Sequence, residues 1–397
     1  MNKNTKIVAA LIALGLVSPM AYATNGDTMM SVGTQNTALG GSGVANFSGA
    51  ESTFANSAML GKSKGQELNV GIVLFKPTVT NTGATVTTAA TSAADTSYIP
   101  DISYSSRIND NLSFGVAMAG IAGMGVDYTN VANAANYYRA RTTLNILNIV
   151  PTIAYNDKDY GVGFSPVLQY GALGISFNTV NPAHDKDTHS GVGYSFGGYF
   201  NVMPALTVAA SYQSSIAHSY GKQLSNAGTA FGQTFADNLD QPAEMKAGVA
   251  YTLATNYTVT ADYRMIQWAS AKGYKEFGWK DQTVIALGGK YAGQGYWVGL
   301  GYNQADNPIS EYAPGTNAYG NDGTIVNMFN NLFFPATIKN SYTFGGGYTV
   351  SKAVDIDAAV VISPEVTTKV ATTNAGAATN TNTHSQQSFA VSMRYKF

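Results

Sequence analysis

The chain has 397 residues and a formal net charge of −1, from 22 Lys and Arg against 23 Asp and Glu. Only 11% of the residues are charged, where a soluble domain carries about 25%, although 45% are hydrophobic. The lack of cysteine excludes a disulfide scaffold or a cysteine-ligated metal centre. The low charge and the 25 Tyr exclude a disordered chain, which would be rich in charge and poor in aromatic residues. The near-neutral net charge offers no electrostatic footprint for nucleic acid.

Residues 1–23 have the three parts of a secretory signal peptide. Lys3 and Lys6 form a positive amino-terminal region, an 11-residue apolar stretch covers residues 7–17, and Ala-Tyr-Ala at 21–23 is a typical cleavage pattern. The apolar stretch is shorter than the roughly 20 residues that a spanning helix needs. We therefore expect cleavage after residue 23, with an uncleaved anchor as the alternative. No later segment could span a bilayer as a helix, so the chain is either secreted or a membrane β-barrel.

Residues 24–64 lack the alternating pattern of strands and are not expected to form barrel wall. Small residues dominate the run from Leu39 to Ala45, and Met, Phe and Leu follow within 52–60. Low charge and small side chains favour compact packing in a confined space. We predict an N-terminal hatch, or plug, inside the lumen; a flexible periplasmic tail is the alternative.

From residue 65 to 397, hydrophobic and polar residues alternate in a repeated period of two, which is typical of strands with one apolar face. The clearest example is 257–266, where Tyr257, Val259 and Tyr263 alternate with polar residues. The pattern predicts about fourteen strands. They cover 66–80, 97–107, 111–126, 142–156, 160–180, 188–201, 206–217, 244–255, 257–266, 282–291, 296–303, 338–350, 354–362 and 385–397.

The connections between these strands alternate between short and long without exception. Short ones such as 108–110 and 157–159 alternate with long ones such as 218–243 and 304–337. Outer-membrane barrels have this pattern, with tight periplasmic turns and longer extracellular loops. We therefore predict an all-β fold, a transmembrane antiparallel β-barrel whose lumen is wide enough to need a plug or a use.

The last strand supports the membrane assignment. Phe389, Val391, Met393, Tyr395 and Phe397 form one apolar face that ends in an aromatic residue. A strand of this form resembles the signal that the outer-membrane barrel assembly machinery reads. Together with the signal peptide, it favours a barrel over a soluble sandwich.

The predicted strand 111–126 contains a weak point in the wall. Gly120, Gly123 and Gly125 lie within it, and glycines inside strands often mark bulges or bends. Counting back through a turn centred on Asn109 places Met118 roughly opposite Pro100. Proline cannot donate a hydrogen bond to the ladder. We predict a kink that opens the wall sideways; ordinary barrel-shaping bulges are the alternative.

Two long loops are unusually apolar. In 218–243, Ala227, Phe231, Phe235 and Leu239 recur every four residues and predict one face of a short helix. In 304–337, apolar residues crowd together and include Phe329, Leu332, Phe333 and Phe334. We expect these loops to form a hydrophobic ligand groove, although they could instead pack on each other as a cap. The lumen residues Lys246 and Arg264 are possible contacts for a ligand's polar head, with structural pairing as the alternative.

Short motifs along the chain are similar to one known family. Gly40 to Ala45 and Asn-Ser-Ala at 56–58 resemble its hatch motif, and barrel motifs recur at 98–100, 112–115, 151–155, 268–270, 286–288 and 307–309. The family is that of FadL-type long-chain fatty-acid transporters of Gram-negative outer membranes, with relatives that import aromatic hydrocarbons. The resemblance implies a fourteen-stranded barrel, an extracellular groove, an interior pocket and a lateral opening. It also implies a hatch containing Gly40, Gly41, Gly43, Asn56, Ser57 and Ala58.

The chain departs from this family at three places. Ser57 stands where the hatch motif has proline, and the loop at 181–187 is short where fatty-acid transporters build part of their groove. The expected mature start, residues 24–27, lacks the apolar residue that some members insert into the pocket.

The function expected from these features is passive uptake of hydrophobic small molecules, fatty acids or hydrocarbons, in the outer membrane. A barrel lipase or protease would need a positioned base. All four histidines, at 184, 189, 218 and 384, fall in predicted loops or directly beside one, and none lies in the middle of a predicted strand. We expect no enzyme, cofactor, metal or nucleic-acid partner. The expected partners are the hydrophobic ligand, outer-membrane lipid and lipopolysaccharide, and the barrel assembly machinery. A general porin or surface adhesin is the alternative.

Overall fold

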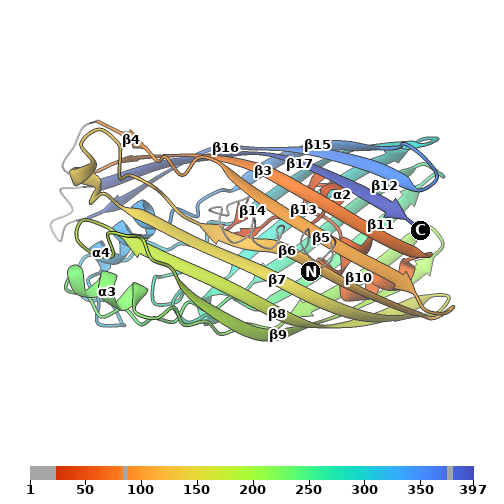
Figure 1. Cartoon of the computed structure of the whole chain (residues 1–397), viewed down its shortest axis with the longest axis horizontal. Helices are drawn as coiled ribbons and strands as arrows, with labels where there is room; N and C mark the ends of the chain where they lie inside the picture. The colour runs from red at the N-terminus through yellow and green to blue at the C-terminus, as the bar shows by residue number, and fades with distance from the viewer. Residues whose placement is uncertain (1–23, 84–87, 373–378) are drawn as a thin grey trace, which may run out of the picture.

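The computed structural model describes residues 24–83, 88–372 and 379–397, so the predicted signal peptide at 1–23 lies outside the described residues. Fourteen long antiparallel strands form a barrel (Figure 1). They are β3 (Gln66–Thr82), β5 (Ser97–Arg107), β6 (Leu112–Met124), β7 (Arg141–Asn156), β8 (Tyr160–Ser176), β9 (Asp187–Met203), β10 (Leu206–Gln213), β11 (Glu244–Leu253), β12 (Tyr257–Ile266), β13 (Gln282–Ala292), β14 (Tyr296–Ala305), β15 (Asn340–Thr349), β16 (Val354–Ala371) and β17 (Thr379–Lys396).

The barrel closes between its first and last long strands. Each long strand pairs with its neighbours in the chain, and β17 pairs with β3 from Thr381↔Thr82 to Lys396↔Glu67. Three two-residue strands, β1 (Thr24–Asn25), β2 (Thr28–Met29) and β4 (Ala90–Thr91), add to this sheet. Closure leaves no long free edge. A sheet can cross a membrane only when its edges are closed in this way.

All fourteen predicted strands are present, and their short and long connections alternate along the chain. The largest difference is at 363–384, where we expected a long loop. There β16 and β17 continue as a paired ribbon, from Val366↔His384 to Ala371↔Thr379, after a bulge between Ser363 and Val366. Val and Thr are frequent in this stretch, and their branched side chains favour strands. At 160–180 the strand is shorter than predicted and ends at Ser176.

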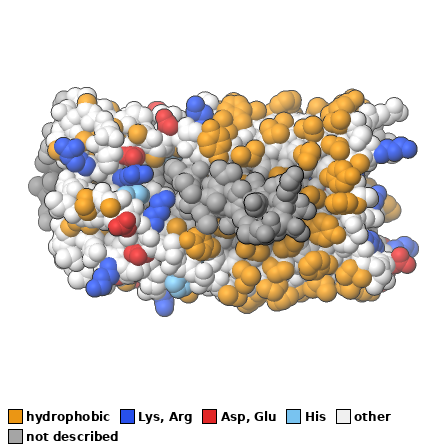
Figure 2. All heavy atoms as spheres, in the orientation of Figure 1, with side chains coloured by type: hydrophobic (Ala, Val, Ile, Leu, Met, Phe, Trp, Pro, Cys, Tyr) orange, Lys and Arg blue, Asp and Glu red, His pale blue; other side chains and the backbone are white. Residues whose placement is uncertain are grey.

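The outward face of the wall is apolar. Tyr296, Val298 and Leu300 on β14 are 45%, 41% and 66% exposed, as expected for side chains that face lipid. Figure 2 shows a broad band of hydrophobic side chains over the strands, with charged side chains at the long-loop end and at the opposite rim. Within the described residues, no helix is long and apolar enough to cross a membrane.

The N-terminal segment, residues 24–64, lies inside the barrel (Figure 1). It contains the hairpin β1–β2, the short helix α2 (Thr34–Ala38) and the 3-10 turns η1 (Ala50–Phe54) and η2 (Ser57–Lys62). Most of its side chains are buried, and it contacts strands on several sides of the wall. The segment therefore fills much of the lumen.

The long loops fold over one end of the barrel, and we call them the cap: residues 125–140, 177–186, 214–243, 267–281 and 306–339. The cap contains η3 (Ala134–Tyr137), α3 (Gln223–Ala230), η4 (Trp268–Ser270), α4 (Gly323–Met328) and the π-helical turn η5 (Phe329–Phe333). Buried hydrophobic residues from all of these loops form one cluster. Strand residues such as Leu144 and Ile146 of β7 and Leu173 of β8 belong to the same cluster, so the cap packs continuously onto the inner face of the wall.

Candidate functional site

The glycines predicted for a hatch attach the N-terminal segment to the wall. The Gly40 amide donates to Thr343 Oγ1 at 2.9 Å, and its carbonyl accepts from Asn303 Nδ2 at 2.9 Å. Gly40 has a φ of 71°, which glycine adopts without strain. The wall residue at this contact is Gly301. A Cβ on Gly301 would lie 2.1 Å from the Gly40 nitrogen, so no larger residue fits there. The backbones of segment and wall thus meet directly.

The next two predicted glycines continue this attachment. Gly41, with a φ of 87°, donates from its amide to Asn36 O at 2.9 Å within the segment. The Gly43 amide donates to Asp262 Oδ2 on β12 at 2.6 Å, and the Val44 amide donates to the same oxygen at 2.9 Å. The wall therefore supplies a carboxylate for two backbone donors of the segment.

The predicted Asn-Ser-Ala motif forms a second attachment on the opposite strands. Asn56 Oδ1 accepts from the Ala58 amide at 3.0 Å and caps η2, while its Nδ2 donates to Gly198 O of β9 at 3.2 Å. A Cβ on Gly163 would lie 2.3 Å from the carbonyl carbon of Ser57. Asn56 therefore both starts η2 and fixes it against β9, while β8 approaches closely at Ser57.

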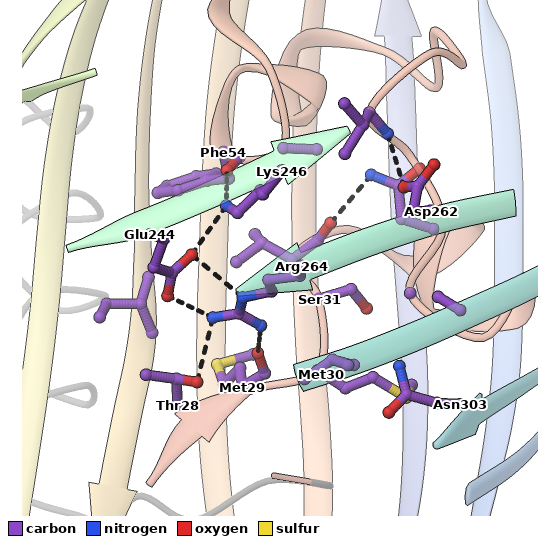
Figure 3. A pocket seen from close by; sticks show the side chains of 18 of the residues that line it. Thr28, Met29, Met30, Ser31, Phe54, Glu244, Lys246, Asp262, Arg264 and Asn303 are labelled. Atoms are coloured by element: carbon purple, nitrogen blue, oxygen red, sulfur yellow. Dashed lines mark hydrogen bonds and ion pairs between the residues drawn. The ribbon is translucent and has the colours of Figure 1, made fainter. Parts of the chain in front are cut away.

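An internal cavity of about 80 Å³ lies between the N-terminal segment and the wall (Figure 3). Apolar side chains line one part of it, and Glu244, Lys246, Asp262 and Arg264 line another. The apolar lining residues are Met29, Met30, Val32, Val44, Phe54, Ala55, Ile121, Val284 and Ala286. The cavity therefore has both an apolar and a charged part.

The two cations predicted to meet a polar head are already paired. Lys246 Nζ lies 3.0 Å from Glu244 Oε2 and donates to Phe54 O at 3.2 Å. Arg264 also pairs with Glu244 and donates to Met29 O and Thr28 Oγ1, both at 3.0 Å. In this state both cations hold the N-terminal segment (Figure 3). Glu244, which the sequence pattern did not single out, begins β11 and is the carboxylate that brings them together.

The wall has a gap between β5 and β6. Their ladder runs from Arg107↔Ser113 to Asp101↔Ala119 and then stops, although both strands continue. Beyond that point, β5 pairs only with β3, and β6 pairs with β7 through a bulge between Gly120 and Ala122. The predicted weak point at Pro100, Gly120 and Gly123 therefore lies where the two strands separate.

The predicted pairing of Pro100 was wrong. Met118 lies opposite Ile102, and Pro100 is the first residue of β5 beyond the end of the ladder. Gly125 lies just past the end of β6 and approaches β7, since a Cβ there would lie 2.3 Å from Thr142 O.

The tip of the N-terminal segment fills the gap. Thr28 of β2 pairs with Ala122 of β6, and the Gly123 amide donates to Asp27 O at 2.9 Å. The hairpin β1–β2 thus takes the place that β5 leaves. Without it, the backbone groups of β6 at Ala122 and Gly123 would lose these partners.

The predicted groove residues lie together but do not form an open groove. The most exposed of them, Phe231, packs against Phe333 and Phe177, and its ring centroid lies 6.1 Å and 5.0 Å from theirs. The others are at most 8% exposed: Phe235, Leu239, Phe329, Leu332, Phe333 and Phe334. A small apolar cavity of about 20 Å³ remains beside Leu239, Phe329 and Phe334.

The predicted helical stripe in 218–243 was also wrong. Helix α3 ends at Ala230, and Gly232 has a φ of 69°, so only Ala227 of the stripe is helical. Phe235 and Leu239 reach the same cluster from an irregular segment. The four-residue spacing therefore marks residues that pack in the same hydrophobic cluster, although they do not lie on one continuous helix.

The histidines at the extracellular end contact other polar side chains. His218 Nδ1 lies 3.3 Å from His189 Nδ1, and its Nε2 lies 2.7 Å from Gln169 Oε1. His184 Nε2 lies 3.0 Å from Thr143 Oγ1, and its Nδ1 lies 3.1 Å from Ser176 Oγ. Burial lowers the pKa of His218 to about 4, and burial lowers that of His184 to about 4 as well. No group of three or more potential metal ligands occurs within 24–83, 88–372 and 379–397.

The sequence of the chain matches a family model, "Outer membrane protein transport protein (OMPP1/FadL/TodX)", over residues 19–397. A curated relative, the long-chain fatty acid transport protein of Escherichia coli O6:H1 strain CFT073, is 24% identical over 374 residues, covering 76% of this chain and 81% of the relative.

Solved structures share the fold. A FadL homologue of Pseudomonas aeruginosa superposes with a TM-score of 0.70 and 14% identity, covering 94% of this chain and 100% of the homologue. The toluene transporter TodX of P. putida gives 0.68 and 16%, with 93% and 99% coverage. The Ralstonia pickettii toluene transporter TbuX gives 0.65 and 16%, again with 93% and 99% coverage.

The family match spans nearly the whole chain, and the closed barrel agrees with it. The relatives carry the names of transport proteins and channels, not of enzymes. The chain therefore belongs to the OMPP1/FadL/TodX family of outer-membrane transport proteins.

Proposed function

We propose that the protein takes up hydrophobic small molecules, fatty acids or hydrocarbons, passively through the outer membrane. The ligand is captured in the extracellular cap, passes the N-terminal segment to the internal cavity and leaves sideways into the membrane between β5 and β6. The observation that carries this proposal is the end of the β5–β6 ladder at Asp101↔Ala119, because a closed wall would give a ligand no lateral exit. Toluene transporters and a fatty-acid transporter among the relatives support this class of ligand.

Capture would use the aromatic core of the cap. Its rings lie at contact distance, with centroids 5.3 Å apart for Tyr138 and Phe231 and 5.0 Å apart for Phe177 and Phe231. Burying a ligand among them would contribute about 0.8 kcal/mol for each CH₂ group. The cavity beside Leu239 and Phe329 holds only about 20 Å³, so its own lining side chains, such as Phe277 and Phe329, must separate to admit a ligand.

Release would require the N-terminal segment to act as a hatch. The hairpin β1–β2 occupies the gap and bonds to β6, so a ligand can leave only when the hairpin moves. No energy source is needed, since the ligand moves down its own gradient into hydrocarbon. Lys246 and Arg264 would become available to a polar head only after their bonds to the segment break.

The outward faces fit the expected membrane partners. Phe389, Val391 and Met393 on β17 are 43%, 50% and 46% exposed on the lipid side, and Phe397 is 70% exposed. We propose that this face meets outer-membrane lipid and lipopolysaccharide, and that the assembly machinery reads β17 during insertion.

A disulfide across the gap tests lateral release. Thr28 and Ala122 are Cα partners of an antiparallel bridge, and the chain has no cysteine of its own. Oxidised T28C/A122C should lock the hairpin in the gap and reduce uptake of radiolabelled toluene or oleate by at least about tenfold, and a reductant should restore it.

The matched control places a disulfide where the wall is already paired. Ser103 and Ala117 are Cα partners on β5 and β6 below the gap, so oxidised S103C/A117C should leave uptake unchanged. Full uptake by the oxidised T28C/A122C protein would show that ligands do not leave through this gap.

A substitution in the cap tests capture. Phe231 is only partly buried, so Phe231→Ala should preserve the cap while removing ring contacts to Tyr138, Phe177 and Phe333. We expect ligand binding to weaken by about 10- to 100-fold, the loss from one buried aromatic side chain. Ligand co-purified from detergent and identified by mass spectrometry would give its class; unchanged affinity in the variant would place capture elsewhere.

A further inference from the structure

One buried carboxyl group joins the cap to the N-terminal segment. Asp27 lies in the turn between β1 and β2 and is fully buried. Its Oδ2 accepts a hydrogen bond from the Tyr274 hydroxyl, and Gln241 Nε2 lies 3.5 Å from the same oxygen. Tyr274 and Gln241 both belong to cap loops. Asp27 Oδ1 has no hydrogen-bond partner among the described residues.

The backbone of the same residue joins the segment to the gap. The Gly123 amide of β6 donates to Asp27 O at 2.9 Å, next to the Thr28↔Ala122 bridge. The side chain of Asp27 therefore contacts the cap while its carbonyl contacts the gap. A displacement at either contact is carried to the other through one residue.

Tyr274 lies where a captured ligand would press. Its ring centroid lies 4.5 Å from that of Trp268 and 4.8 Å from that of Trp279, and it lines the small apolar cavity with Phe329 and Phe334. Gly26 is packed beneath these rings, since a Cβ there would lie 2.9 Å from Trp268. A ligand larger than this cavity must displace lining side chains, and Tyr274 is one of them.

We propose that Asp27 is a positioning residue that couples ligand capture to opening of the gap: a ligand entering beside Tyr274 breaks the Tyr274–Asp27 hydrogen bond, and the freed hairpin leaves β6. This inference rests on the proposed function and specifies what releases the hatch.

The protonation of Asp27 would modulate the coupling. Burial raises its pKa to about 7, although hydrogen bonds from Tyr274 and Gln241 lower it. The other groups that act on it are Glu244, which raises this pKa, and Arg264, which lowers it. The Tyr220 phenol, whose own pKa Asp27 raises, is also close.

The direction of the pH effect follows from these pKa values. A released Asp27 in water would have its ordinary pKa of 3.8, so the docked form retains a proton that the released form loses between pH 4 and pH 7. The hairpin β1–β2 is therefore held in the gap most strongly at low pH. Its attachment weakens as the pH rises to about 7 and is constant above that.

The test measures how often the hairpin is released. Met29→Cys places the sole thiol of the full chain on β2, where the native side chain is 8% exposed and lines the internal cavity. The rate of maleimide labelling in detergent reports release. In this background, Tyr274→Phe removes the donor to Asp27 and should speed labelling about tenfold at pH 6. Toluene should raise the labelling rate of the parent by a similar factor and should raise that of the Tyr274→Phe variant only slightly.

Tyr220→Phe is the matched control. Tyr220 is also fully buried, but its hydroxyl has no hydrogen-bond partner among the described residues, so its loss should leave labelling unchanged. Asp27→Asn keeps an acceptor for Tyr274 but cannot ionise. Because maleimide reacts with the thiolate, each labelling rate is divided by that of free cysteine at the same pH. The corrected labelling rate of Asp27→Asn should stay slow and flat between pH 5 and pH 8, while that of the parent rises. Burial also raises the pKa of Glu51 to about 7. Glu51 is present in both the parent and Asp27→Asn, so its titration does not contribute to the difference between their labelling rates.

The outcomes separate this inference from the proposed function. Equal labelling rates for Tyr274→Phe, Tyr220→Phe and the parent would overturn the role of Asp27, even if the T28C/A122C disulfide blocks uptake. Fast labelling of Tyr274→Phe, with slow labelling of Tyr220→Phe and the parent, supports the coupling. If the oxidised T28C/A122C disulfide then leaves uptake unchanged, the lateral route is wrong while the coupling through Asp27 is still supported.

Discussion

Removing residues 24–64 is expected to turn the protein into an open pore. The segment fills the lumen from several sides, and the internal cavity that it leaves is only about 80 Å³. Barrels of 16–18 strands enclose a water-filled channel, whereas about eight strands enclose little more than side chains. An emptied barrel of fourteen strands should therefore conduct ions at least about tenfold better than the intact protein in planar bilayers.

A second variant covers the case in which the shortened chain does not fold. Gly301→Leu keeps the whole sequence but places a side chain where a Cβ would lie 2.1 Å from the Gly40 nitrogen, so it should displace the segment and raise conductance. Gly289→Leu is the control, because a Cβ at Gly289 meets nothing within 4 Å. If the intact protein already conducts freely, the segment is not a plug and the protein is a general porin.

Replacing Arg394 should strongly destabilise the protein. Its guanidinium pairs with Glu51 at 3.2 Å, Glu67 at 3.3 Å and Asp357 at 3.5 Å, and it also donates to Ser48 O. Arg394→Met would leave these carboxylates without their shared cation. The loss should be about 3–5 kcal/mol, which is typical when one partner of a buried charge network is removed.

Lys396 on the same strand provides the control. Its ammonium pairs only with Asp355 among the described carboxylates, and its side chain is 43% exposed. Lys396→Met should therefore cost less than about 1 kcal/mol. Unfolding by guanidinium in detergent, followed by tyrosine and tryptophan fluorescence, measures both variants. Equal losses would mean that the Arg394 network does not hold the segment to the wall.

Much of the wall could be predicted from the sequence because each strand carries its own period of two. Lipid outside and polar lumen inside impose that period along every strand, so Tyr257 to Ile266 is recognisable without knowledge of its neighbours. Register is less local. The sequence pattern predicts a turn after β5 centred on Asn109, but the observed pairs require a centre at Asp110, and this one-residue error moves the partner of Pro100 by two positions.

The cap and the interior contacts were harder to predict because their partners are far apart in the chain. Asp27 and Tyr274 are 247 residues apart, and neither lies in a motif that indicates the other. The only local signal was an acidic residue after a glycine in an otherwise uncharged stretch. Apolar residues in the loops were correctly recognised as unusual, but sequence alone did not distinguish an open groove from a packed core, and Phe329 and Phe333 proved to be buried.

The glycines that line the wall have a consequence for how the protein is assembled. Gly163, Gly197, Gly301 and Gly345 each lack a side chain at a point where the N-terminal segment approaches the strand. Glycine weakens an isolated strand, so these parts of the wall depend on the segment for packing. The segment is made first, yet it contacts β14, β15 and β16 near the end of the chain. We therefore expect β17 to close onto β3 around a segment already in place, so that segment and wall fold as one cooperative unit.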